Sequence, residues 1–244
     1  LTGANGYSGD TTINRGALRA ADGVGLPTGS NLLLAGGVLE TSGTFSRALG
    51  SGAGQVRWLN SGGYQFADGG FAAQGGPLAV QIGGGTAALT WGGANFVPAA
   101  RALLLGSVTA DSLVDFRNGL SLPAATVPYE VRVEDNAATA ADLARLSGTI
   151  TGAGGLAKTG PGILELTGPN SYAGGMVVSA GRLVADHNTA LGGGSVLVAG
   201  GAVLEVAAGR TLANTLNIQA GGTLAGNGAL ATALALGGGA ILSP

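Results

Sequence analysis

The fold is decided by residues 154–183, which read GGLAKTGPGILELTGPNSYAGGMVVSAGRL. Part of this stretch also opens the chain, because residues 1–20 match residues 166–185 at nine positions without a gap. A second echo joins SNLLLAGGVLE at residues 30–40 to SVLVAGGAVLE at residues 195–205, with a slip of one residue. Self-similarity of this kind indicates a structural unit that is used more than once.

The composition favours an ordered, turn-dense protein with a core of small aliphatic side chains. Of 244 residues, 49 are glycine, whereas only 10% are charged and 5% are aromatic. Disordered chains combine low hydrophobicity with high net charge, and this chain has 45% hydrophobic residues and a net charge of -2. So many glycines indicate turns with positive φ and close approach of backbones.

Alternating apolar and polar side chains predict short, half-buried β-strands along the chain. Clear examples are Leu78/Val80/Ile82, Tyr129/Val131/Val133 and Leu216/Ile218/Ala220. Gly-Gly, Asn-Gly, Asp-Gly and Pro-Gly pairs between such segments indicate tight turns. Only residues 137–146 (AATAADLARL) could form a helix, and they run directly into the strand-like residues 147–151.

These elements predict an all-β fold. Crossover helices are absent from the pattern, which excludes a doubly wound α/β fold. An antiparallel sandwich, an antiparallel barrel and a solenoid remain. The repeat favours a parallel β-helix of about 20 residues per coil, hence on the order of a dozen coils, with inward Leu, Val, Ile and Ala stacked in ladders. A β-sandwich is the main alternative.

The charge pattern bears on partners. Single, scattered arginines and a net charge of -2 give no basic patch for nucleic acid, and no run approaches the roughly 20 apolar residues of a membrane-spanning helix. Cysteine is absent, which excludes disulfides and thiolate metal sites. The sequence offers no metal or cofactor motif, so we expect no cofactor.

Candidate catalytic groups are few. Asp111 and Asp115 share a predicted strand face with Arg117, and two carboxylates can act as acid and base, but we interpret them as a solvated face with a local ion pair. His187, the single histidine, lies in a predicted turn without a motif that would join it to Ser179 or Ser195. We therefore do not predict an enzyme.

Other acidic residues fit structural roles. Glu130 and Glu134 alternate with Arg132 as a surface charge ladder. Glu40 and Glu205 occupy equivalent positions of the repeat, and we expect both to face outward.

Aromatic residues give the one candidate ligand site. Exposed rings could stack on sugars or anchor a protein, whereas buried rings would fill wider coils. Six of the eleven aromatic residues fall within residues 58–96, where the repeat is weakest: Trp58, Tyr64, Phe66, Phe71, Trp91 and Phe96.

Residues 154–183 resemble the passenger-associated transport repeat of bacterial autotransporter passenger domains, whose usual pattern is GGLxKxGxGxLxLxGxNxYxGGTxVxxGxL. Residues 1–18 (LTGANGYSGDTTINRGAL) resemble the second half of another copy. Asp10 and Met176 depart from the pattern, where Gly and Thr are usual. The resemblance implies one β-helical segment over residues 1–244: a repeat copy at 1–40 that is truncated at its start, spacer coils at 41–147, and a second copy with following coils at 148–244.

The resemblance also implies a location and partners. It implies a right-handed helix, secreted or displayed on the surface of a Gram-negative cell through an outer-membrane β-barrel translocator that lies outside this chain. Neither Leu1 nor Pro244 offers a polar cap, so we expect end-to-end or edge self-association. The expected role is a structural stem for an adhesive or effector domain. The alternatives are an adhesin that binds host glycan or protein through residues 58–96 and, last, a polysaccharide-cleaving enzyme.

Overall fold

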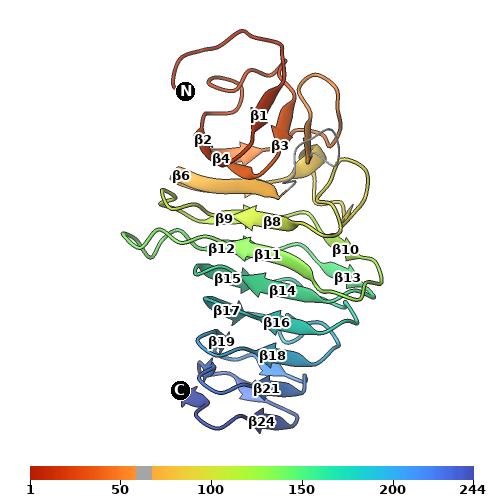
Figure 1. Cartoon of the computed structure of the whole chain (residues 1–244), viewed down its shortest axis with the longest axis vertical. Coiled ribbons are helices and arrows are strands. Elements are labelled where there is room, and N and C mark those ends of the chain that lie inside the picture. The colour runs from red at the N-terminus through yellow and green to blue at the C-terminus, as the bar shows by residue number, and fades with distance from the viewer. Residues whose placement is uncertain (59–67) are drawn as a thin grey trace.

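The computed structural model describes residues 1–58 and 68–244, and these residues form an all-β solenoid (Figure 1). Every ladder between named strands in them is parallel. The described residues contain one short 3₁₀ turn, η1 (Ile82–Gly84), and no α-helix. Parallel ladders without crossover helices define a parallel β-helix, as the repeat predicts; its handedness stays a prediction.

Two columns of strands run along the main sheet. The first column contains β2 (Gly16–Arg19), β4 (Gly37–Phe45), β6 (Gly69–Val80), β8 (Ala102–Leu105), β11 (Tyr129–Val133), β14 (Leu156–Thr159), β16 (Met176–Val178), β18 (Val196–Val198), β21 (Leu216–Ile218) and β24 (Leu234–Leu236). The second column continues from the ends of β4 and β6 through β9 (Val114–Phe116), β12 (Ala144–Leu146), β15 (Ile163–Leu166), β17 (Arg182–Ala185), β19 (Val203–Val206), β22 (Thr223–Ala225) and β25 (Ile241–Ser243).

Smaller sheets close the coils on other sides. They are β1 (Thr11–Ile13) with β3 (Leu32–Leu34) and β5 (Val56–Trp58); β7 (Leu89–Thr90) with β10 (Leu120–Leu122) and β13 (Ile150–Gly152); and β20 (Thr211–Leu212) with β23 (Ala229–Leu230). Figure 1 shows the rungs stacked along the long axis, with the early strands at one end and β24 at the other.

Coil length divides the molecule into two regions. Leu156, Met176, Val196 and Leu216 are successive partners, so each of these coils takes 20 residues. Between residues 38 and 143, here called the wide coils, the partners are farther apart, reaching 36 residues between Leu78 and Val114. Residues 144–244 are here called the regular coils. The wide coils explain why the first column has ten rungs rather than a dozen.

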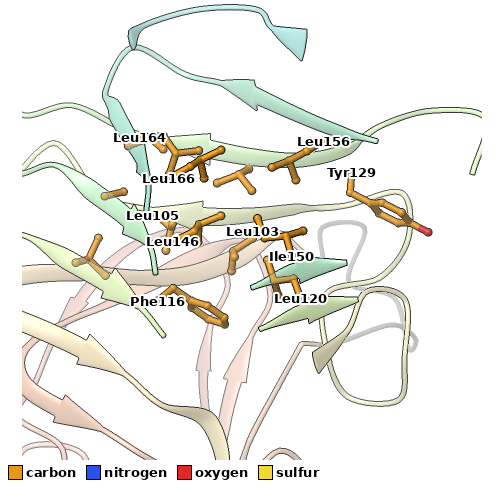
Figure 2. Packing of buried hydrophobic residues seen from close by; sticks show 14 of the residues in the cluster. Leu103, Leu105, Phe116, Leu120, Tyr129, Leu146, Ile150, Leu156, Leu164 and Leu166 are labelled. Atoms are coloured by element: carbon orange, nitrogen blue, oxygen red, sulfur yellow. The ribbon is translucent and has the colours of Figure 1, made fainter. Parts of the chain in front are cut away.

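The interior is a continuous aliphatic and aromatic column. Along β11, Tyr129, Val131 and Val133 are buried while Glu130 and Arg132 are partly exposed, and most strands of the regular coils alternate in the same way. Figure 2 shows inward side chains of successive rungs, among them Leu146, Leu164 and Leu166, lying against each other. Dry burial of stacked side chains is the main stabilising term of such a fold.

Two local features differ from simple expectations. Residues 137–143, the larger part of the possible helix, form turns and irregular backbone, and Ala144–Leu146 is strand β12. The last rung leaves Leu236, Ile241 and Leu242 about half exposed, because no further rung covers them.

Candidate binding surface

The predicted aromatic residues fill the interior of the wide coils. Trp58, Phe71 and Trp91 are 2%, 0% and 1% exposed, and Phe96 is equally buried. The Trp58 Nε1 donates a hydrogen bond to the Gly69 carbonyl at 2.9 Å. Tyr64 and Phe66 lie outside the described residues.

Ring contacts link these residues into one aromatic cluster. The Trp58 ring centroid lies 6.1 Å from that of Phe71 and 5.0 Å from that of Phe96, and Trp91 lies 5.4 Å from Tyr129. Edge and tilted contacts at such distances are favourable for aromatic pairs. In this structure the rings of Trp58, Phe71 and Trp91 therefore present no face to a ligand, and they fit the packing alternative. A longer coil encloses a wider interior, which large side chains fill.

The candidate catalytic residues are held apart by structural contacts. Asp111 accepts hydrogen bonds from the Gly75 amide at 2.9 and 3.1 Å, whereas Asp115 accepts from Arg117 Nε at 2.8 Å and from Ser147 Oγ at 2.7 Å. His187 lies near Thr189, with 3.1 Å between Nδ1 and Oγ1, on an exposed turn.

Acidic, histidine and cysteine side chains form no metal site in the part of the chain that the structure describes. Within residues 1–58 and 68–244, no group of three or more histidine, cysteine or acidic side chains could hold a metal ion.

Glu40 and Glu205 share a repeat position but not an environment. Glu205 pairs with Arg182 at the surface, whereas Glu40 is 2% exposed. The 106–112 segment covers the outer face of β4 and β6, and Ser107 Oγ donates to Glu40 at 2.5 Å, joined by Thr109 Oγ1 and Arg19 Nε. Burial alone would raise the pKa of Glu40, but these hydrogen bonds lower it below its ordinary value.

Lys158 is a buried charged residue whose role the sequence analysis did not predict. It stands in an inward ladder between Val131 and Val178, and its Nζ donates to the carbonyls of Thr159, Gly160 and Ala180 at 2.9, 2.7 and 3.0 Å. Burial lowers the pKa of Lys158 to about 8. Lys158 lies two residues after the inward-facing Leu156, and this spacing in the sequence could have predicted that it faces inward. Its three hydrogen bonds to backbone carbonyls hold the adjoining turns.

Buried asparagines fasten other turns. Asn170 accepts from the Ile150 amide at 2.8 Å and donates to the Ala190 carbonyl at 2.7 Å, which links three consecutive rungs. Asn118 plays a similar part beside η1, where it donates to the carbonyls of Ile82, Gly85 and Ala87. Paired amides of this kind satisfy backbone groups that would otherwise be buried without partners.

A partly polar hollow of about 410 Å³ lies on the outer surface, where the wide coils meet the first regular coil. We call it the hydroxyl hollow. Three successive coils line it with Thr86, Ala88, Arg117, Gly119, Ser147, Gly148, Thr149 and Thr151. Thr151 also continues an outward hydroxyl row, since it pairs with Ser121, which pairs with Thr90.

A second, larger hollow of about 780 Å³ lies between two loops of the wide coils. Small apolar residues line most of it, including Ala99, Ala124 and the exposed Val127, with Arg101 and Glu130 at its charged positions. The larger hollow lies within the wide coils, and the wide coils supply two of the three rungs that line the hydroxyl hollow.

One further observation concerns membranes. Across residues 1–58 and 68–244, no helix has the length and apolar character that crossing a bilayer requires.

Comparison with known proteins connects this β-helix to bacterial surface proteins. The passenger-associated transport repeat family matches residues 1–20 and 156–185. The adhesin BmaC autotransporter of Brucella suis biovar 1 (strain 1330) is 42% identical over 93 residues, which are 37% of this chain and 3% of that protein. No solved structure matches the chain.

These matches coincide with structural units. Residues 156–185 run from β14 through β17, which are two stacked rungs that include Lys158 and Asn170. Residues 1–20 and 156–185 thus match the passenger-associated transport repeat, and together with the relative these matches support an autotransporter passenger. Such a passenger is displayed on, or secreted from, the outer membrane of a Gram-negative cell.

Proposed function

We propose that this chain is part of the stem of an autotransporter passenger, in which the regular coils set length and stiffness and support an adhesive or effector domain. The observation that carries the proposal is the even 20-residue rung of residues 156–216, with an uninterrupted interior. Each rung contacts only its neighbours, so length follows directly from the number of rungs.

Deleting one regular coil tests the stem role. Removing residues 176–195 from the full passenger joins Gly175 to Val196, which already occupies the register position of Met176. We expect normal surface display, a cooperative fold and a rod shortened by about 4.8 Å, the inter-strand spacing. Loss of display or of folding would contradict the stem role.

A second candidate function is adhesion by the wide coils themselves. Two hollows on the outer surface support it, as does the similarity of part of the chain to an adhesin. Adhesion of cells that display the full passenger, before and after deletion of residues 114–143, tests it. Val114 and Ala144 are register partners, so this deletion also removes one whole coil. Adhesion should fall after this deletion and persist after deletion of residues 176–195; equal adhesion of both variants would contradict a role of the wide coils.

The remaining partners follow from the passenger assignment. We propose that its own outer-membrane translocator carries the chain to the surface, and that a host glycan or protein is the contacted partner. The half-exposed Leu236, Ile241 and Leu242 support end-to-end association in the purified segment.

A further inference from the structure

We propose that the hydroxyl hollow binds an acidic glycan, a hydroxyl-rich chain that carries carboxylates. The inference rests on the adhesin function proposed above and names the class of its ligand. The shape of the hollow, its hydroxyl groups and its charge all suit such a ligand.

The shape suits a chain that lies across several rungs. Thr86 and Ala88 come from one coil, Arg117 and Gly119 from the next, and residues 147–151 from the third. Parallel strands repeat at about 4.8 Å, so equivalent groups recur at that interval along the hollow. Gly119 and Gly148 have no side chain, and a Cβ at Gly148 would lie 2.3 Å from the Asn118 carbonyl oxygen. The base of the hollow is thus closely packed backbone, above which the threonines stand.

The hydroxyl groups are available to a ligand. Thr149 and Thr151 flank the buried Ile150, so both point away from the core. Among the described residues, the side chains of Thr86, Thr149 and Thr151 have no hydrogen-bond partner. A hydroxyl both donates and accepts, which matches the hydroxyls of a sugar.

The charge exposed in the hollow is positive. Arg117 is the one charged residue of its lining, and its side chain is 44% exposed, against 11% for its partner Asp115. Asp115 accepts hydrogen bonds from Arg117 Nε at 2.8 Å and from Ser147 Oγ at 2.7 Å. It therefore lies beneath the guanidinium and fixes its orientation. The two Nη groups of Arg117 make no hydrogen bond to the described residues. Guanidinium groups bind carboxylates by paired, charge-assisted hydrogen bonds.

A smaller hollow extends this surface. It has a volume of about 280 Å³, shares Arg117 with the hydroxyl hollow, and adds Asp115 and Arg145. Arg145 donates to Glu165 at 2.6 Å and is more exposed than that carboxylate, so here too the cation lies outermost. A chain with carboxylates at intervals can therefore meet Arg117 and then Arg145.

Binding of a short oligogalacturonate to the purified chain, followed by calorimetry and by saturation-transfer NMR, tests the proposal. The methyl-esterified oligomer is the control ligand, because esterification removes the charge and keeps the hydroxyl-rich chain. We expect binding of the acidic oligomer at least ten times tighter than that of the ester, and weaker as salt is added. Equal binding of the two oligomers, or no binding of the acidic oligomer, would overturn the proposal.

Variants locate the site. Arg117→Gln should weaken binding of the acidic oligomer at least tenfold, and the double variant Thr149→Val, Thr151→Val should weaken it severalfold. The matched control is Arg210→Gln: Arg210 is 41% exposed and donates its Nε to Asp186 at 2.9 Å, but it lies in the regular coils outside the hollow. Arg210→Gln should bind as the wild type does. Thermal melting of each variant shows that the fold is kept.

Two outcomes separate this inference from the function on which it rests. If cells displaying the Arg117→Gln passenger adhere as the wild type does, the hollow is not the contact surface and the inference fails, while adhesion by other parts of the wide coils stands. If deletion of residues 114–143 leaves adhesion unchanged, the proposed adhesin function fails.

Discussion

The wide coils and the regular coils both enclose a buried interior, but they fill it with different side chains. Regular coils of about 20 residues enclose a narrow interior that is filled mostly by Leu, Val, Ile and Ala, with Tyr172 and Met176 beside them, and Lys158 and Asn170 hold the turns by hydrogen bonds. Wide coils enclose Trp58, Trp91 and several phenylalanines, and their extra length forms loops and hollows outside. A single β-helix can therefore combine rungs of uniform length in one region with loops and hollows on the outer surface of another.

The largest change in stability is expected from a substitution in the aromatic interior of the wide coils. Trp58→Ala should lower the free energy of unfolding by about 3–5 kcal/mol, because it leaves a cavity beside Phe71 and Phe96. Denaturant unfolding measures the change, and Trp58→Phe should lose markedly less. Unchanged stability would return Trp58 to the list of candidate ligand contacts.

Two glycine replacements, one in each region, test how closely a neighbouring backbone approaches the replaced residue. A Cβ at Gly174, in the regular coils, would lie 2.3 Å from the Gly155 amide nitrogen, whereas a Cβ at Gly85, in the wide coils, would meet nothing within 4 Å. Gly174→Ala should therefore destabilise by about 1–3 kcal/mol, and Gly85→Ala should be nearly neutral. Thermal melts of both variants check this; equal losses would show that the neighbouring backbone does not limit the side chain at position 174.

Substitution of two glutamates at equivalent repeat positions compares a buried carboxylate of the wide coils with a surface carboxylate of the regular coils. Glu40→Gln weakens charge-assisted hydrogen bonds beneath the 106–112 segment and should cost about 1.5 kcal/mol, whereas Glu205→Gln at the surface should cost a few tenths. The pKa of Glu40 is lowered in the fold, so its contribution is present above the ordinary pKa and is lost as pH falls through the folded value.

Unfolding measured from pH 7 down to pH 3 checks both glutamates. The advantage of wild type over Glu40→Gln should shrink at the acid end of this range. An advantage that grows toward low pH would contradict the assigned direction.

The smallest effect is a pH dependence in the regular coils. The pKa of Lys158 is about 8 in the fold and near 10.5 in the unfolded chain. Between these values the unfolded chain binds more protons, so stability should rise with pH, by about 1 kcal/mol from pH 8 to pH 9. Lys158→Met should lack this rise. A wild-type curve that falls over this interval relative to Lys158→Met would contradict the burial argument.

The sequence alone predicts the regular coils well, because parity there is strict. Leu164, Leu166 and Leu183 are buried between neighbours that are partly or fully exposed, and this alternation fixes which side chains face inward once strands are assumed. The repeat then gives the stacking, since Leu164 and Leu183 occupy the same register position.

The wide coils are less predictable for physical reasons. An aromatic residue such as Trp91 fits a buried or an exposed site equally well until the width of the coil is known, and that width depends on pairing between residues 30 or more apart. Glu40 looks like Glu205 in sequence, yet the 106–112 segment covers it from far along the chain. The hydroxyl hollow likewise needs three coils to be placed together before Thr86 and Thr149 become neighbours.

The central claim is that successive coils stack in parallel with a fixed register, and disulfide trapping tests it most directly because the chain has no cysteine of its own. Leu197, Asn217 and Ala235 occupy one outward column on consecutive rungs. The pair Leu197→Cys, Asn217→Cys should oxidise readily, because partners on adjacent rungs lie about 5 Å apart, within disulfide reach. The pair Leu197→Cys, Ala235→Cys, two rungs apart, should stay reduced. Oxidation of the second pair in preference to the first would contradict the parallel stack.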